Sequence, residues 1–158
     1  MKAALPIVLL TSALSWGAHA HEGYDNALKA YSCVDYPKAL TLFKQYADQG
    51  HGLSQYMSGI MLEQGQGADA DVKAAYDWYM KAAKQGLADA YYALGDMYMR
   101  GVFVPRDKVQ ANAWFQLASQ GGHKLSNDML AEDSLKLSGE QADKAAAFIK
   151  GWIEKLQK

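Results

Sequence analysis

The sequence predicts an all-α protein, an α-solenoid of antiparallel helix pairs that ends in a C-terminal capping helix. Two observations carry this prediction. The first is an internal repeat, because residues 38–50, 74–86 and 110–122 are related by steps of 36 positions, close to the length of one helix pair. The second is that each copy has a helix start, an apolar stripe and a helix stop in the same order.

Each repeated segment follows an aspartate and ends at a glycine. An aspartate ahead of an apolar run can accept hydrogen bonds from the free amides of the first helical turn, and glycine can take the left-handed conformation that ends a helix. Between them, an aromatic residue with a small residue four positions away on either side forms one helical stripe. The columns are Asp35, Asp71 and Asp107; Ala39, Ala75 and Ala111; Phe43, Tyr79 and Phe115; Ala47, Ala83 and Ser119; and Gly50, Gly86 and Gly122.

The other half of the repeat shows the same step, since Tyr56, Gly59, Met61 and Gly65 match Tyr92, Gly95, Met97 and Gly101. We therefore expect four antiparallel helix pairs. Their predicted bounds are 24–33 with 36–49, 53–64 with 72–85, 89–100 with 108–120, and 124–135 with 139–157.

The N-terminal 20 residues predict a secretory signal peptide. Lys2 precedes an apolar run that is shorter than the roughly 20 residues of a membrane span, and small residues at Ala18 and Ala20 suit a signal peptidase. We expect residues 1–20 to be removed and residues 21–158, beginning at His21, to form a single domain. The expected location is periplasmic or secreted, with no membrane insertion after cleavage.

Charge and cysteine content argue against a nucleic-acid partner and against an internal disulfide. The formal net charge is −1, so the basic footprint of a nucleic-acid-binding protein is absent and nucleic acid is not an expected partner. The single cysteine, Cys33, has no second cysteine with which to form an internal disulfide. A bridge to another chain and burial are both open, and burial is favoured because free cysteine is among the most often buried residue types.

Residues 88–122 resemble the Sel-one-like repeat, a branch of the tetratricopeptide superfamily. The residues that carry the resemblance are Ala90, Leu94, Gly95, Tyr98 and Gly101 in the first helix, and Asp107, Ala111, Trp114, Phe115 and Ala118 in the second. Residues 52–86 keep much of this pattern but have Ser54, Ser58 and Leu62 where alanine, leucine and tyrosine are usual, so their first helix is expected to pack less tightly. Residues 24–50 resemble a divergent pair, and residues 124–157 a degenerate pair with the cap.

The C-terminal segment departs from the period. Ser138 and Gln141 have the spacing of a capping box, and an apolar set then continues through Phe148 and Trp152 to Leu156. Because a repeat stack must cover its last layer, we interpret residues 139–157 as the closing cap. A membrane-surface helix is the rival interpretation, and it would need a broader basic face.

Histidines and glycine-rich turns supply no convincing catalytic or metal site. His51 and His123 lie two repeats apart, and Leu87 fills the same position between them, so this is first of all a packing position. His21 could chelate copper through its free amine and ring after cleavage, but the sequence places no second histidine beside it. The segment from Gly65 to Gly67 follows a predicted helix, whereas a dinucleotide fingerprint follows a strand.

The remaining enzyme and cofactor signatures are absent from the sequence as well. Asp69 and Asp71 alternate as calcium ligands can, but the glycine and final glutamate of a calcium loop are missing. Cys33 has no catalytic signature around it, and no Ser-x-x-Lys motif occurs. We expect no enzyme activity, no cofactor and no metal.

The resemblance implies where a partner would bind. In tetratricopeptide-like solenoids the first helices of successive pairs line a concave groove, which here gives the partner-binding residues Tyr56, Ile60, Glu63, Asp89, Tyr92, Asp96, Met99, Arg100 and Asp128, with Leu53, Gln64, Leu125 and Glu132 around them. Tyrosines, aliphatic residues and acids suit a peptide with apolar anchors and some positive charge.

The expected function is therefore a non-enzymatic protein-protein interaction module of a bacterial-type cell envelope, which binds a protein or peptide in this groove. The alternative is a carbohydrate-binding or peptidoglycan-binding envelope protein that uses the same tyrosines, and an envelope hydrolase is the least favoured class. The tryptophans argue for a protein partner, since Trp78 and Trp114 lie on second helices, away from the groove.

Overall fold

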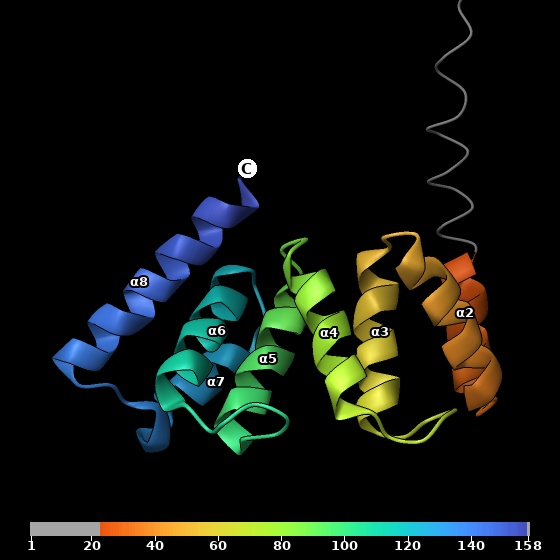
Figure 1. Cartoon of the computed structure of the whole chain (residues 1–158), viewed down its shortest axis with the longest axis horizontal. Helices are drawn as coiled ribbons and strands as arrows, with labels where there is room; N and C mark the ends of the chain where they lie inside the picture. The colour runs from red at the N-terminus through yellow and green to blue at the C-terminus, as the bar shows by residue number, and fades with distance from the viewer. Residues whose placement is uncertain (1–22, 158) are drawn as a thin grey trace, which may run out of the picture.

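The computed structural model describes residues 23–157, and every regular element in this part of the chain is helical (Figure 1). The all-α prediction is therefore confirmed. The predicted signal peptide and His21 lie outside the described residues. None of the helices in residues 23–157 is both long enough and apolar enough to cross a membrane.

From residue 23 to α6 the helices follow one another in chain order across Figure 1, and α7 and α8 both pack on α6. Each of α2 to α6 packs on the next helix along the chain, as in an α-solenoid. For the first three predicted pairs, no bound differs from the structure by more than two residues. The elements are a helix over 23–32, α2 (Tyr36–Asp48), α3 (Gly52–Glu63), α4 (Val72–Ala83), α5 (Ala88–Arg100), α6 (Lys108–Gln120), α7 (Leu125–Ala131), the 3-10 helix η1 (Asp133–Leu135) and α8 (Gly139–Leu156).

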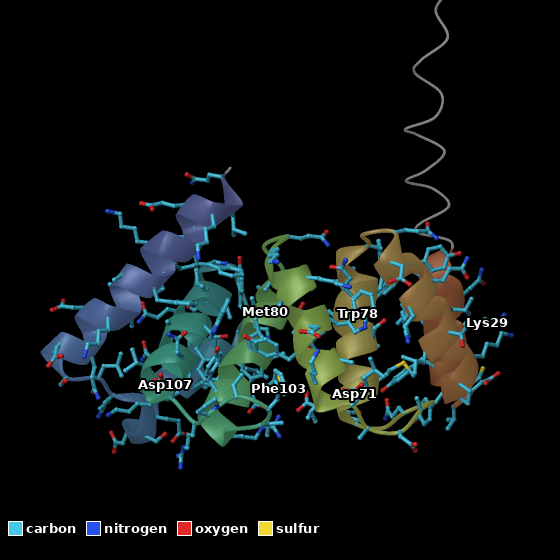
Figure 2. All side chains as sticks on the ribbon, viewed as in Figure 1. Lys29, Asp71, Trp78, Met80, Phe103 and Asp107 are labelled. Carbon is cyan, nitrogen blue, oxygen red and sulfur yellow. The ribbon has the colours of Figure 1, made fainter. Side chains whose placement is uncertain are left out.

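The aspartate caps and glycine stops form as predicted. Asp71 accepts a hydrogen bond from the Ala74 amide at 2.9 Å, and Asp107 accepts from the amide of Gln110 at 3.1 Å. Asp71 and Asp107 both lie along the lower edge in Figure 2, where α4 and α6 begin. After the C-terminal ends of the second helices α2, α4 and α6, three glycines have left-handed φ angles: Gly50 at 91°, Gly86 at 79° and Gly122 at 88°.

Within the second and third helix pairs, a glycine of the first helix packs closely against an aromatic ring of the second. A methyl group built at Gly95 would lie 2.8 Å from two ring carbons of Phe115, and one at Gly59 would lie 2.5 Å from the Tyr79 ring. Phe115 and Tyr79 are almost completely buried. The glycine and aromatic columns of the repeat are therefore two sides of one packing contact.

The fourth pair differs from the prediction. Instead of one helix over 124–135, α7 ends at Ala131, Glu132 is extended, and η1 follows. This break places Leu135 in a buried cluster with Ala111 and Phe115. There the Leu135 carbonyl accepts a hydrogen bond from the side-chain Nδ2 of the buried Asn112 at 3.1 Å. A continuous helix would hold Leu135 in the register set by α7, so burial of this side chain accounts for the break.

The C-terminal helix is a cap, as predicted, but it packs mainly on α6 and not on α7. Its Trp152 ring meets the Trp114 ring edge-on, with ring centroids 4.8 Å apart, and its indole N–H donates to the Tyr91 hydroxyl at 3.2 Å. The predicted bond between the Ser138 amide and the Gln141 side chain starts the helix, at 3.1 Å. Trp114 is thereby almost fully buried.

Cys33 is exposed, which contradicts the expected burial. It lies in the turn between the helix over 23–32 and α2, one residue before Val34, whose φ is 62°. The small residues that face the core in this first helix are Ala27 and Ala30. Cys33 comes just after the helix ends, so the fold directs its side chain away from the core.

Candidate partner-binding face

The predicted groove residues all lie on first helices of the repeat. We call the surface formed by the helix over 23–32 together with α3, α5 and α7 the first-helix face. The structure places Tyr56, Ile60 and Glu63 on α3, Asp89, Tyr92, Asp96, Met99 and Arg100 on α5, and Asp128 on α7. These residues serve different purposes, because some are bonded to one another and others are exposed.

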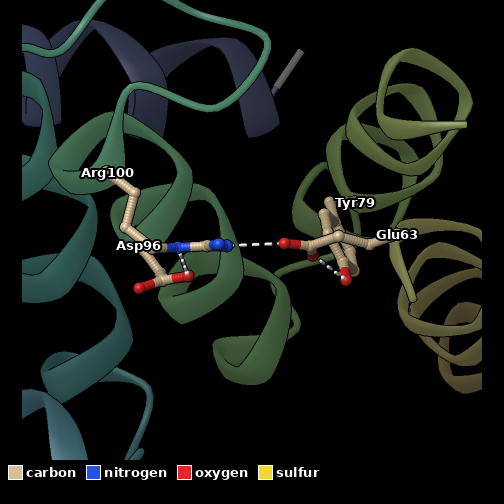
Figure 3. A network of polar contacts seen from close by, with 4 residues as sticks. All are labelled: Glu63, Tyr79, Asp96 and Arg100. Carbon is tan, nitrogen blue, oxygen red and sulfur yellow. Dashed lines mark hydrogen bonds and ion pairs between the residues drawn. The ribbon is translucent and has the colours of Figure 1, made fainter. Parts of the chain in front are cut away.

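Four polar residues form a network that joins three helices (Figure 3). The Arg100 guanidinium donates to Glu63 at 2.5 Å and to Asp96 at 2.6 Å. The second oxygen of Glu63 accepts from the Tyr79 hydroxyl at 2.9 Å. In Figure 3 the bond between Arg100 and Glu63 crosses the space between α5 and α3.

This network is a brace between neighbouring repeats. The Glu63 side chain is only 20% exposed, against 44% for Arg100, so Glu63 lies on the inner side of the pair. Burial raises the pKa of Tyr79, and the adjacent Glu63 carboxylate raises it further. The prediction from sequence did not include Tyr79 in this site, because Tyr79 belongs to a second helix and reaches the face only through its hydroxyl.

Tyr56 and Tyr92 stand in the same repeat column and are half-buried. Each leans on the aromatic residue of its own second helix, Tyr56 on Tyr79 at 5.9 Å and Tyr92 on Phe115 at 5.3 Å between ring centroids. Burial raises the pKa of Tyr56 to about 12, with a smaller contribution from the nearby Asp89 carboxylate. Both tyrosines are therefore only partly exposed, because each packs against the core of its own helix pair.

Tyr24 is a third member of this column that the sequence analysis missed. Its ring packs on Phe43 at 5.8 Å, as Tyr56 packs on Tyr79. The period conceals it because Tyr24 precedes Phe43 by 19 residues, whereas Tyr56 precedes Tyr79 by 23. The tighter turn of the first pair shifts the register, so aligning each tyrosine with its own second-helix aromatic would have found it.

Beside the tyrosines, a second column exposes one carboxylate between two leucines. Leu53, Asp89 and Leu125 are separated by 36 residues each. Leu53 is 38% and Leu125 57% exposed, high values for leucine. The Asp89 side chain is 45% exposed and has His123 Nε2 at 3.7 Å.

The other predicted residues are less suited to binding. Ile60 is half-buried against the main core, and Met99 packs against the small cluster around Leu135. Asp128 is exposed on α7. Gln64 is the C-cap of α3 and Glu132 the C-cap of α7, so both lie at helix ends.

His51 and His123 act in the structure at the start of first helices. His51 Nδ1 accepts a hydrogen bond from the Ser54 amide at 3.2 Å, and His123 Nδ1 lies 3.0 Å from the Ser126 hydroxyl. The His123 ring also stacks on Tyr92, with centroids 4.3 Å apart. In residues 23–157 no group of three or more histidine, cysteine or acidic side chains is arranged to hold a metal ion.

Two pockets of about 430 Å³ lie apart from the predicted groove residues. One lies between α6 and α8 and is lined by Gln116, Ile149 and Ile153 among others. The other is beside Cys33 and includes Lys29 and Lys38. Neither contains a residue of the predicted groove.

Comparison with known proteins identifies the repeat. A family model described as the Sel1 repeat matches residues 28–51, 52–87 and 88–123. The chain is 40% identical over 98 residues to the sel1-like repeat-containing protein L21 of Acanthamoeba polyphaga mimivirus, covering 61% of this chain and 17% of that protein. It is 38% identical over 76 residues to the chitin synthase regulator SKT5 of Malassezia restricta, covering 46% of this chain and 5% of that protein.

Solved structures show the same architecture. The protective antigen c5321 of uropathogenic Escherichia coli, which has an SLR fold, superposes with a TM-score of 0.70 at 28% identity, over 87% of this chain and 30% of that one. A Sel1 repeat protein from Oxalobacter formigenes superposes with a TM-score of 0.63 at 27% identity, over 66% of this chain and 43% of that one. The chain thus spans only a small part of the relatives' length.

Proposed function

We propose that this chain, which belongs to the Sel1 repeat family, binds a peptide or protein partner on its first-helix face. Sel1 repeats are protein-interaction modules. The observation that carries the proposal is the exposure of Leu53 and Leu125 in one column with Asp89, next to three partly exposed tyrosines. Apolar and aromatic side chains around few charges are typical of the centre of a protein interface.

The structure also favours a protein partner over a carbohydrate. A sugar site would use exposed aromatic platforms, but Trp78 and Trp114 are 7% and 2% exposed. Tyr56 and Tyr92 are tilted against their second-helix partners, so only part of each ring is available. The leucines have no role in sugar binding, whereas they suit apolar anchors of a peptide.

We further propose that the protein works in the cell envelope, either in the periplasm or after secretion. The signal-peptide pattern of residues 1–20 supports this location. The mass of the protein isolated from its host should correspond to a chain that starts at His21, and a mass that includes residues 1–20 would contradict the proposal.

The binding face can be tested by site-specific photocrosslinking. A photoreactive phenylalanine analogue at Leu53 or Leu125 should give one discrete adduct with a protein in living cells, since both positions are exposed. Matched probes at Lys44 and Lys84, exposed positions on α2 and at the end of α4, serve as controls. Adducts that form only from the control positions would overturn the first-helix face as the site, and no adduct from any position would count against a protein partner.

Alanine substitution of the tyrosines would not test the same point. Tyr56 and Tyr92 support the core, so their removal would destabilise the fold as well as the face. Leu53→Ser and Leu125→Ser instead change exposed groups, and surface substitutions usually alter stability by less than about 0.5 kcal/mol. Loss of the crosslinked adduct in these variants, at unchanged helical content, would support the proposal.

A further inference from the structure

Asp89 is the centre of a feature that the proposed binding face does not by itself explain. It lies in the first turn of α5, where the helix dipole favours a negative charge. Within residues 23–157 no lysine or arginine forms an ion pair with Asp89, although Glu63 and Asp96 on the same face both bond to Arg100. The Asp89 side chain, which is 45% exposed, is therefore open to a cationic ligand.

The surroundings of Asp89 are aromatic and apolar. Burial raises the pKa of Tyr24 and of Tyr56, which are on the two preceding first helices, and nearby carboxylates that include Asp89 raise it further. On the other side, His123 lies 3.7 Å away and stacks on Tyr92. Tyrosine rings attract cations through their faces, and a carboxylate in partly desolvated surroundings attracts them more strongly than one in water.

The column that contains Asp89 also shows what should flank the cation. Leu53 precedes Asp89 by one repeat and Leu125 follows it by one repeat, and both leucines are exposed. A ligand that crosses successive first helices thus meets an apolar contact, a negative charge and a second apolar contact in order. Charge complementarity requires a basic group in the middle, with apolar groups on either side.

We infer that Asp89, beside the tyrosines of the first-helix face, forms a recognition site for one lysine or arginine side chain in a peptide segment whose apolar residues on both sides contact Leu53 and Leu125. This inference rests on the proposed function, because it specifies the ligand of the same face. It explains why the repeat replaces leucine by aspartate at only the middle position of the column.

The test is selection from a displayed library of random dodecapeptides on the immobilised full-length chain. The wild-type chain should select peptides that share one lysine or arginine with apolar residues on both sides. Asp89→Asn keeps the shape of the side chain and removes its charge, so it should still select the apolar residues but lose the basic one. Asp77→Asn is the matched control on α4, where Asp77 pairs with Lys73 on the surface, and it should select the same peptides as the wild type.

Affinity measurements on one selected peptide complete the test. Replacing its basic residue by norleucine should weaken binding to the wild type about tenfold, a size expected for a cation held by aromatic rings and a carboxylate. The same replacement should weaken binding to Asp89→Asn less than about twofold. A basic residue that matters equally in both proteins would overturn the inference.

The outcomes separate this inference from the proposed function. Peptides that lack a basic residue but lose affinity for Leu53→Ser and Leu125→Ser would refute the role of Asp89 and leave the binding face intact. Peptides that bind Asp89→Asn, Leu53→Ser and Leu125→Ser as tightly as the wild type would refute the binding face itself. Selection of no peptide above background would count against both.

Discussion

Substitution of Gly95 by alanine tests the packing contact on which the repeat depends. In a helix interior, alanine is more stable than glycine by about 0.5–1 kcal/mol because glycine loses more backbone entropy on folding. Against this gain, the new methyl group would lie 2.8 Å from two ring carbons of Phe115. The ring is completely buried, so it has no solvent-filled space into which to move.

The steric cost should exceed the gain in helix propensity. Overpacking a core costs typically about 1–3 kcal/mol, so Gly95→Ala should lower the free energy of unfolding by up to about 2.5 kcal/mol once the propensity gain is subtracted. Gly151→Ala is a matched control, because Gly151 lies within α8 and no heavy atom comes within 4 Å of its added methyl group. This control should raise the free energy of unfolding by about 0.5–1 kcal/mol.

Urea unfolding followed by circular dichroism measures both effects. A double variant with Phe115→Leu should show coupling, since a smaller side chain at position 115 relieves the overlap and makes the two changes less than additive. If Gly95→Ala stabilised the protein as much as Gly151→Ala does, the close approach between α5 and α6 would not be the reason for glycine at this position.

Two further predictions concern the first-helix face. Glu63→Gln removes the charge that faces Arg100. Because Arg100 is partly exposed, the expected loss is about 0.5–1 kcal/mol of unfolding free energy at low salt, and the difference from wild type should shrink in high salt. Equal stability of the variant and the wild type at low salt would argue against the brace. Tyr56 has its pKa raised from 10.0 to about 12 in the folded protein, so its contribution to stability is complete below pH 10 and is lost as the pH rises through about 12. Tyr56→Phe should flatten this alkaline decline in unfolding free energy. Asp89→Asn should lower the pKa of Tyr56, which is isolated as the difference between ultraviolet titrations with and without Tyr56→Phe; a difference that titrates near 10 in the wild type would contradict both statements.

Most of the fold was predictable because its signals act over short distances along the chain. Asp71 caps the amide three residues later, and Gly86 ends its helix through its own φ angle. The columns of Gly95 and Phe115 recur at the repeat period as well, although only the structure showed that the two residues pack against each other. Patterns of this kind need no knowledge of how distant segments meet.

The first-helix face was only partly predictable. The helical register correctly assigned Tyr56, Asp89 and Tyr92 to first helices. It did not show that Glu63 and Arg100 bond to each other, because this contact depends on the angle between α3 and α5. It also missed Tyr24, whose place in the column depends on the length of the first turn.

By itself, the sequence determined the order of the repeats and the helices of the first three pairs with their ends, because capping, glycine conformation and helical periodicity are local properties. Only the tertiary structure decided that α7 breaks before Leu135, that α8 covers α6, that Cys33 is exposed and that Asp89 lies 3.7 Å from His123. These features depend on the relative placement of helices that are distant in the chain. That placement is set by which side chains compete for the same buried volume, and no periodic pattern in the sequence specifies the outcome.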